Sequence, residues 1–149
     1  MKKKIITVAA ILVANVSLAQ WTNKTVNNAF DDPYRICYTK ESNGSILKLE
    51  NVDGNVAFYI QGSYFCSEVV TVDMSFMVNG EWKKYVTTAT KGDDSKVLFL
   101  VDNLENSEAV VDFLNSTSVK MRVNEEYCDT EYYEFNMSGS TSAYKFIKG

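Results

Sequence analysis

The chain has 149 residues, contains no histidine, and carries 15 Lys and Arg against 19 Asp and Glu, a formal net charge of −4 at pH 7. Without histidine there is no Ser–His or Cys–His nucleophilic pair and no histidine-ligated zinc site, and the side chain best suited to proton transfer near neutral pH is missing. The acidic balance argues against nucleic acid and against anionic membrane surfaces as partners.

The first twenty residues have the organisation of a secretory signal peptide. Residues 2–4 are lysines, residues 5–14 form an apolar run, and Ser17 and Ala19 are small residues at the positions a signal peptidase reads. We therefore predict cleavage between Ala19 and Gln20 and a single domain over residues 20–149, exported to the periplasm or the extracellular space. Cleavage removes three lysines, which changes the net charge from −4 to −7. The apolar run is too short to span a bilayer, so no stable membrane insertion is expected afterwards.

Turn dipeptides and alternating apolar residues predict strands through most of the domain. Asn43-Gly44, Asp53-Gly54 and Asn79-Gly80 are strong hairpin signals, because both residues accept the positive φ of tight turns. Residues 69–78 alternate, which predicts a half-buried strand whose inner face carries Val70, Val72, Met74, Phe76 and Val78.

Two further segments extend this pattern. Residues 96–101, "KVLFLV", are continuously apolar and predict a central strand covered on both faces. Residues 119–124 alternate, which places Val119, Met121 and Val123 opposite Lys120, Arg122 and Asn124.

Two short segments have helical spacing instead. In residues 106–116, Val110, Phe113 and Leu114 fall on one face, and Asn106 or Ser107 can cap the start. In residues 140–149, Ala143, Phe146 and Ile147 do the same, with Ser140 or Thr141 as the cap after a turn at Gly139. We predict an all-β fold, an antiparallel β-sandwich or barrel-like sandwich, with one short helix before the penultimate strand and one at the C-terminus.

The three cysteines permit three pairings in an oxidising compartment, or three unpaired thiols. We favour a Cys66–Cys128 disulfide, because each follows an aromatic residue at the end of an apparent strand. In the chain-entropy model such a bridge stabilises the fold by about 4 kcal/mol. Cys37 lies within the strand "YRICYTK", where a core thiol is a better interpretation than a nucleophile activated by Arg35.

The C-terminal order of helix, strand, strand, small-residue turn and helix resembles the end of the invasion-associated locus B family of exported bacterial proteins. The matching positions are Val119 to Val123, Ser138, Gly139, Thr141 and Ala143. The resemblance extends from Asp73 to Ile147, whereas the N-terminal half and the cysteine positions do not follow the family. It implies a periplasmic or secreted all-β domain without established enzymatic chemistry, and it supplies no catalytic residue.

The stretch "EEYCDTEYYEF", residues 125–135, concentrates the remaining chemistry. Alternation assigns Tyr133, Phe135 and Met137 to the core and leaves an outward row of Tyr132, Glu134 and Asn136. Trp82 and Trp21 are further candidates for exposed rings, the alternative being that both cover the core.

Carboxylates offer two other interpretations. A pair among Glu125, Glu126, Asp129, Glu131 and Glu134 would suit glycoside hydrolysis. A calcium site is slightly more plausible than this catalysis, with oxygen ligands from Asp31, Asp32, Asp129 or Glu131, although no calcium-binding loop pattern supports it. No residue pattern indicates a cofactor.

The sequence therefore predicts an exported, non-enzymatic binding or accessory protein. Its expected partner is a protein or a glycan, recognised through Tyr132, Glu134, Asn136 and Trp82. The alternative is a small carboxylate-dependent enzyme that acts on glycans.

Overall fold

The computed structural model describes residues 21–27, 29–62, 64–100 and 108–149. The predicted signal peptide at residues 1–19 lies outside the described residues. Within them, nine strands and two helices follow one another: β1 (Thr22–Val26), β2 (Tyr34–Lys40), β3 (Ile46–Val52), β4 (Asn55–Gln61), β5 (Val69–Val78), β6 (Glu81–Lys91), β7 (Val97–Leu100), α1 (Glu108–Asn115), β8 (Ser118–Asn124), β9 (Glu131–Asn136) and α2 (Ser140–Lys148).

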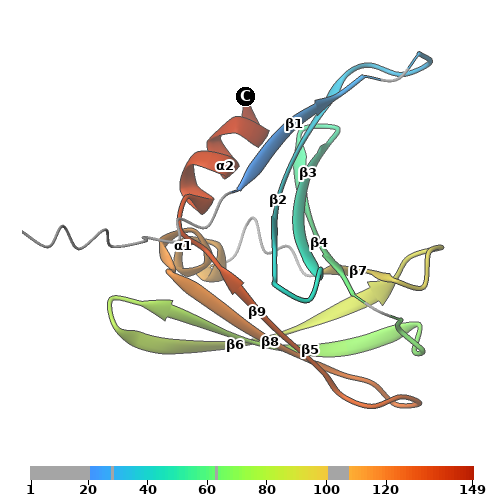
Figure 1. Cartoon of the computed structure of the whole chain (residues 1–149), viewed down its shortest axis with the longest axis vertical. Coiled ribbons are helices and arrows are strands. Elements are labelled where there is room, and N and C mark those ends of the chain that lie inside the picture. Colours follow the sequence, from blue (N-terminus) through green and yellow to red (C-terminus); the bar gives the residue numbers. More distant parts are fainter. Residues whose placement is uncertain (1–20, 28, 63, 101–107) are drawn as a thin grey trace, which may run out of the picture.

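The strands form one antiparallel sheet in the order β1-β2-β3-β4-β7-β6-β5-β8-β9, so that β1 and β9 are its two edges. The sheet bends strongly at its centre, and Figure 1 shows β1 to β4 running steeply across β5, β6 and β8. The two halves thereby face each other as the layers of a sandwich, which confirms the predicted fold class. Both helices have the predicted places, one before the penultimate strand and one at the C-terminus.

Two of the three predicted tight turns adopt the conformations that their residues indicated, whereas in the third Gly44 has a positive φ of 93° and Asn43 does not have a positive φ. Asp53 and Gly54 have φ values of 51° and 86° between β3 and β4. Asn79 and Gly80 have φ values of 52° and 81° between β5 and β6. Two successive positive φ values match the right-handed twist of the flanking strands, so these dipeptides fix the hairpin register.

The core lies between the two halves of the sheet. The predicted inner faces are buried on β5 (Val70, Val72, Met74, Phe76, Val78), β8 (Val119, Met121, Val123) and β9 (Tyr133, Phe135), as is Met137 just after β9. Leu47, Leu49, Phe58 and Ile60 oppose them from β3 and β4. Alternation therefore identified correctly which face of β5, β8 and β9 points inward.

Helix α1 closes one side of this core through Phe113. Its buried ring meets Phe58 and Phe76 edge-on, with centroid distances of 5.2 Å and 5.8 Å. The helix is held against β6 by Asp112, whose carboxylate accepts hydrogen bonds from Tyr85 and, at 3.0 Å, from Lys83. These bonds lower the pKa of Asp112, with the Tyr85 hydroxyl as the larger cause.

The start of α2 corrects one prediction. The N-cap is Gly139, in the left-handed region with a φ of 90°, and no side chain caps the helix. The hydroxyls of Ser140 and Thr141 instead donate to the carbonyl oxygen of Leu114, each at 2.9 Å. They satisfy an acceptor near the end of α1, so the two helices support each other. The proposed caps Asn106 and Ser107 of α1 lie outside the described residues.

Two further expectations are wrong in part. β7 is central in the sheet, but Phe99 is 38% exposed, so this strand is covered on one face only. Cys66 and Cys128 form the predicted disulfide, with a Cα–Cα distance of 5.9 Å. They lie in the β4–β5 and β8–β9 connections rather than at strand ends.

None of the described helices is long and apolar enough to cross a membrane.

Candidate functional site

The outer face of β6, β5, β8 and β9 arranges its side chains in rows, because opposite residues of antiparallel strands lie side by side. The strand register gives three such rows. The Tyr132 row contains Val86, Asp73, Arg122 and Tyr132. The Glu134 row contains Lys84, Ser75, Lys120 and Glu134. The Trp82 row contains Trp82, Met77, Ser118 and Asn136.

The first two rows line a groove with a volume of about 560 Å³. This volume falls within the range of small-molecule and oligomer sites, roughly 300–1,000 Å³. Tyr132 and Val86 are 69% and 68% exposed at opposite sides of the sheet face. The side chains that form the groove are Glu41, Asp73, Ser75, Lys84, Val86, Lys120, Arg122, Tyr132 and Glu134.

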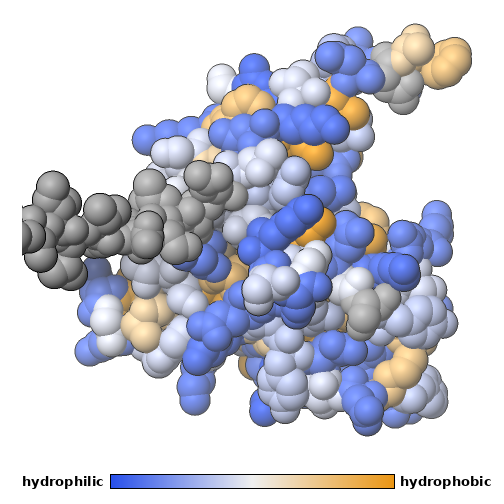
Figure 2. Space-filling view, in the orientation of Figure 1, coloured by the Kyte–Doolittle hydropathy of each residue, from blue (hydrophilic) through white to orange (hydrophobic). Residues whose placement is uncertain are grey.

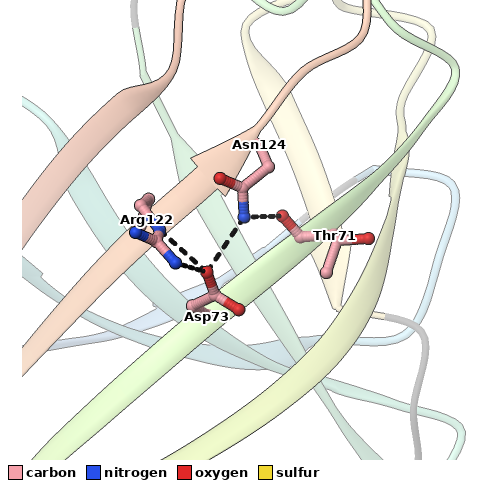
Figure 3. Close-up of polar contacts among 4 residues, drawn as sticks. All are labelled: Thr71, Asp73, Arg122 and Asn124. Carbon is pink, nitrogen blue, oxygen red and sulfur yellow. Dashed lines mark hydrogen bonds and ion pairs between the residues drawn. The ribbon is translucent and has the colours of Figure 1, made fainter.

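Asp73 is the centre of a polar network on the floor of the groove (Figure 3). Its Oδ2 atom accepts hydrogen bonds from Arg122 Nε at 2.8 Å, from Arg122 Nη2 and from Asn124 Nδ2 at 3.0 Å. The Arg122 guanidinium, followed by the Asn124 amide, lowers the pKa of Asp73. Asn124 also donates to the carbonyl oxygen of Thr71 at 3.4 Å. The network fixes one carboxylate and one guanidinium across β5 and β8, and each neutralises the other.

Two lysines of the Glu134 row have no such partner. Among the described residues, no carboxylate lies within ion-pair distance of the ammonium group of Lys84 or Lys120. Lys120 Nζ instead lies 4.9 Å from the ring centroid of Trp82, which is 40% exposed. A ring face attracts a cation without neutralising it, so the ammonium group of Lys120 keeps its charge. The ammonium groups of both lysines are therefore available to a ligand.

Glu41 joins the groove from the opposite half of the sandwich. It follows β2, and its Oε1 atom accepts a hydrogen bond from the backbone N–H of Glu134 on β9. The N–H of Glu134 therefore points away from β8 towards the open edge of the sheet. The Glu134 carboxylate accepts a long hydrogen bond from Ser118 Oγ at 3.4 Å. Glu41 thus fixes the backbone on which the outward row Tyr132, Glu134 and Asn136 is presented.

The first part of the acidic stretch has a structural role. Glu125 Oε2 accepts hydrogen bonds from the backbone N–H groups of Cys66, at 2.7 Å, and Ser67, at 2.9 Å. In return, the N–H of Glu126 donates to Ser67 Oγ at 3.1 Å. Together with the Cys66–Cys128 disulfide, these bonds tie the β8–β9 connection to the segment that leads into β5. Glu125 is therefore an anchor between two connections through its Oε2 atom, whereas its buried Oε1 atom has no hydrogen-bond partner among the described residues.

The residues suggested for calcium do not come together. Asp31 and Asp32 lie in the β1–β2 connection, and Asp129 lies in the β8–β9 connection, which Figure 1 places at opposite ends of the molecule. Over residues 21–27, 29–62, 64–100 and 108–149, one group has the ligand types and proximity of a metal site: Cys66, Glu125 and Cys128. Its two sulfurs form the disulfide, so they are not available as thiolate ligands.

Cys37 is unsuited to nucleophilic chemistry. It is unpaired and fully buried on β2, and burial raises the pKa of its thiol to about 12. A thiol in this state is protonated and inaccessible at neutral pH, which agrees with the interpretation of Cys37 as a core residue. Trp21 is likewise partly buried and packs against the core, whereas Trp82 remains exposed.

Of the four predicted binding residues, the structure brings Tyr132 and Glu134 into the groove. Trp82 borders it through Lys120, and Asn136 lies in the same neighbouring row without lining it. Alternation predicts that Lys120 and Arg122 lie on the solvent-exposed face of their strand, but it does not show that they are neighbours of Tyr132. Only the register of β8 against β9 shows that they are neighbours. Lys84, Val86 and Glu41 were not predicted, because nothing in their local sequence marks them.

Comparison with family models, with curated proteins and with solved structures finds no match to this chain.

Proposed function

We propose that the chain is an exported, non-enzymatic binding or accessory protein that recognises a protein or a glycan in the groove on the outer face of β6, β5, β8 and β9. Tyr132 and Glu134 contact the partner directly, and Trp82 and Asn136 extend the contact along the next row. The observation that carries the proposal is the combination of an open groove with an exposed tyrosine and two lysines that lack a carboxylate partner. Aromatic rings beside polar groups are typical of recognition surfaces.

The state of the carboxylates favours binding over catalysis. A glycosidase needs one carboxylic acid and one carboxylate that both face the scissile bond. In this groove Asp73 is held by three donor groups and Glu41 by a backbone N–H, whereas Glu125 is used outside the groove as an anchor. Glu134 accepts one long hydrogen bond from Ser118 Oγ, and Glu41 has one oxygen, Oε2, that is buried without a hydrogen-bond partner among the described residues. Recognition requires no second carboxylate.

Two other observations agree with an exported protein. A disulfide persists in oxidising compartments such as the periplasm and the extracellular space. The resemblance of the C-terminal half to the invasion-associated locus B family points to the same compartments, and membership of that family remains a hypothesis. Both the compartment and the partner are therefore part of the proposal.

A capture experiment with matched variants tests this function. The purified protein is applied to arrays of neutral and anionic glycans and to proteins from cell envelopes and culture supernatant. Tyr132→Ala should reduce retention on the true ligand at least tenfold, whereas Tyr127→Ala should not. Tyr127 is a suitable control because it is 75% exposed but lies in the β8–β9 connection, outside the groove.

Two results would contradict the proposal. The first is capture that both tyrosine variants retain equally, since the groove would then not be the binding site. The second is release of reducing ends from a glycan that disappears in Glu134→Gln, since that would make the chain the small carboxylate-dependent enzyme.

A further inference from the structure

The charge of the groove differs from that of the chain as a whole. The chain is acidic, and the groove contains Lys84, Lys120 and Arg122 against three carboxylates. These six charged groups are not equivalent, because some of them already form ion pairs or hydrogen bonds within the protein. The groups without an ionic partner within the protein are the ones that can bind a charged ligand.

Both charges of the Tyr132 row are occupied. Arg122 and Asp73 form an ion pair across β8 and β5, and Asn124 completes the contacts of the same carboxylate oxygen. Glu41 is held at the edge of the groove by the N–H of Glu134. Among the described residues that line the groove, the groups without an ionic partner are the ammonium groups of Lys84 and Lys120 and the carboxylates of Glu134 and Glu41. The two carboxylates lie at the β9 side of the groove, whereas the two ammonium groups flank β5.

The two lysines are arranged as a pair. Lys84 and Lys120 are both opposite Ser75, on the strands that flank β5. Neighbouring strands are about 4.8 Å apart, which places the two lysine backbones roughly 10 Å from each other with one hydroxyl between them. Trp82 lies beside Lys120 in the next row, and Tyr132 stands at the far side of the groove. The row thus alternates cations with hydrogen-bonding groups between two exposed aromatic rings.

We propose that the ligand is an anionic polysaccharide, whose carboxylate or sulfate groups bind Lys84 and Lys120 while a sugar ring packs against Trp82 or Tyr132. This inference rests on the proposed binding function and names the class of its partner. Sugar rings present apolar C–H faces to aromatic side chains and hydroxyls to polar ones, and the acidic groups supply the complement to the two ammonium charges.

The groove suits this ligand better than the other partner class in the proposed function. A stable protein interface buries about 800 Å² on each partner around a dehydrated apolar centre. Here the apolar side chains Val86, Tyr132 and Trp82 are separated by charged residues, and Figure 2 shows apolar surface only in small scattered patches on the face in view. A volume of about 560 Å³ is instead within the range of sites for small ligands, roughly 300–1,000 Å³.

Isothermal titration calorimetry with three probes tests the inference. The probes are an oligogalacturonate, which carries carboxylates, dextran sulfate, which carries sulfate esters, and a neutral cello-oligosaccharide. At low ionic strength the oligogalacturonate or dextran sulfate should bind and the neutral probe should bind at least tenfold more weakly. The preferred anionic probe identifies the acidic group. Lys84→Gln and Lys120→Gln should each weaken Kd about fivefold, the change expected for an exposed ion pair.

Lys24→Gln combined with Lys145→Gln is the matched control, because it removes two exposed lysines from β1 and α2. This control should retain the affinity of the unaltered protein, although it lowers the net charge by two, which is more than either single variant does. Equal affinity for neutral and anionic probes, or equal loss in the control variant, would overturn the inference and leave the proposed function intact. Binding of a protein but of no sugar, still dependent on Tyr132, would have the same meaning. Loss of the Tyr132 dependence itself would refute the proposed function.

Discussion

Glu125 provides the sharpest test of the structure, because one carboxylate oxygen holds two backbone N–H groups of a distant segment. Replacing Glu125 by alanine leaves the N–H groups of Cys66 and Ser67 without this acceptor. Hydrogen bonds to a charged group contribute about 1.5–3 kcal/mol each, and the lower end applies because the site is only partly buried. We therefore expect Glu125→Ala to lower the free energy of unfolding by about 3 kcal/mol. For a domain of this size that corresponds to a fall in Tm of about 10 °C.

The assay is urea unfolding followed by circular dichroism, with the disulfide intact in every sample. Glu126→Ala is the control, because the Glu126 side chain is exposed and its hydrogen bond to Ser67 is donated by the backbone N–H, which alanine keeps. That variant should lie within about 0.5 kcal/mol of the unaltered protein. If Glu125→Ala and Glu126→Ala had the same stability, the anchoring role of Glu125 would be refuted. Glu125→Gln should lie between them, since the amide oxygen still accepts hydrogen bonds without the charge.

Three other predictions concern the cysteines and the core. Replacing both Cys66 and Cys128 by alanine should lower the stability by about 4 kcal/mol in urea unfolding, and an unchanged midpoint would contradict the bridge. The raised pKa of Cys37, about 12, means that the folded chain keeps a proton that the unfolded chain loses above about pH 9. The stability of the protein should therefore fall by up to about 1.4 kcal/mol per pH unit from pH 9 towards pH 12. Between pH 8 and pH 10, the measured free energy of unfolding should fall less for Cys37→Val than for the unaltered protein. Phe113→Ala should cost about 3–5 kcal/mol in thermal unfolding, whereas the exposed Val111→Ala on the same helix should cost less than 0.5 kcal/mol.

The local order of the fold was predictable where a side-chain pattern repeats. Strand β5 alternates over ten residues, so its buried and exposed faces follow from the sequence alone. The turns at Asp53-Gly54 and Asn79-Gly80 require positive φ at both residues, and Asp, Asn and Gly are the residue types that tolerate it, so both turns could be predicted from the sequence. In contrast, β1 was not predicted, because four of its five residues are exposed and no apolar alternation marks it.

The errors arise where distant segments meet. Ser140 looked like a helix cap, but the end of α1 offers the carbonyl of Leu114 as a partner, which no local pattern can reveal. The apolar run predicted that Phe99 is buried, but its side chain on that face of β7 is partly exposed. The candidate site also depends on contacts between distant segments. The exposure of Tyr132 was predicted from alternation, but its position beside Arg122 is set by the register of β8 against β9, which sequence spacing does not reveal. Pairing between segments is a tertiary property, so alternation can assign a face but cannot assign the neighbours on it.

The hydrogen bond from Glu134 to Glu41 has a consequence for self-assembly. β9 is an edge strand, and the free backbone groups of an edge can pair with a strand of a second copy and begin an ordered aggregate. Glu41 occupies one of these groups in the middle of β9 and places a carboxylate where an incoming strand would lie. At high local concentration the chain is thereby protected at this edge by a residue from the opposite layer of its own fold. Glu41→Ala should consequently remove a barrier to polymerisation while leaving the core of the sandwich unchanged.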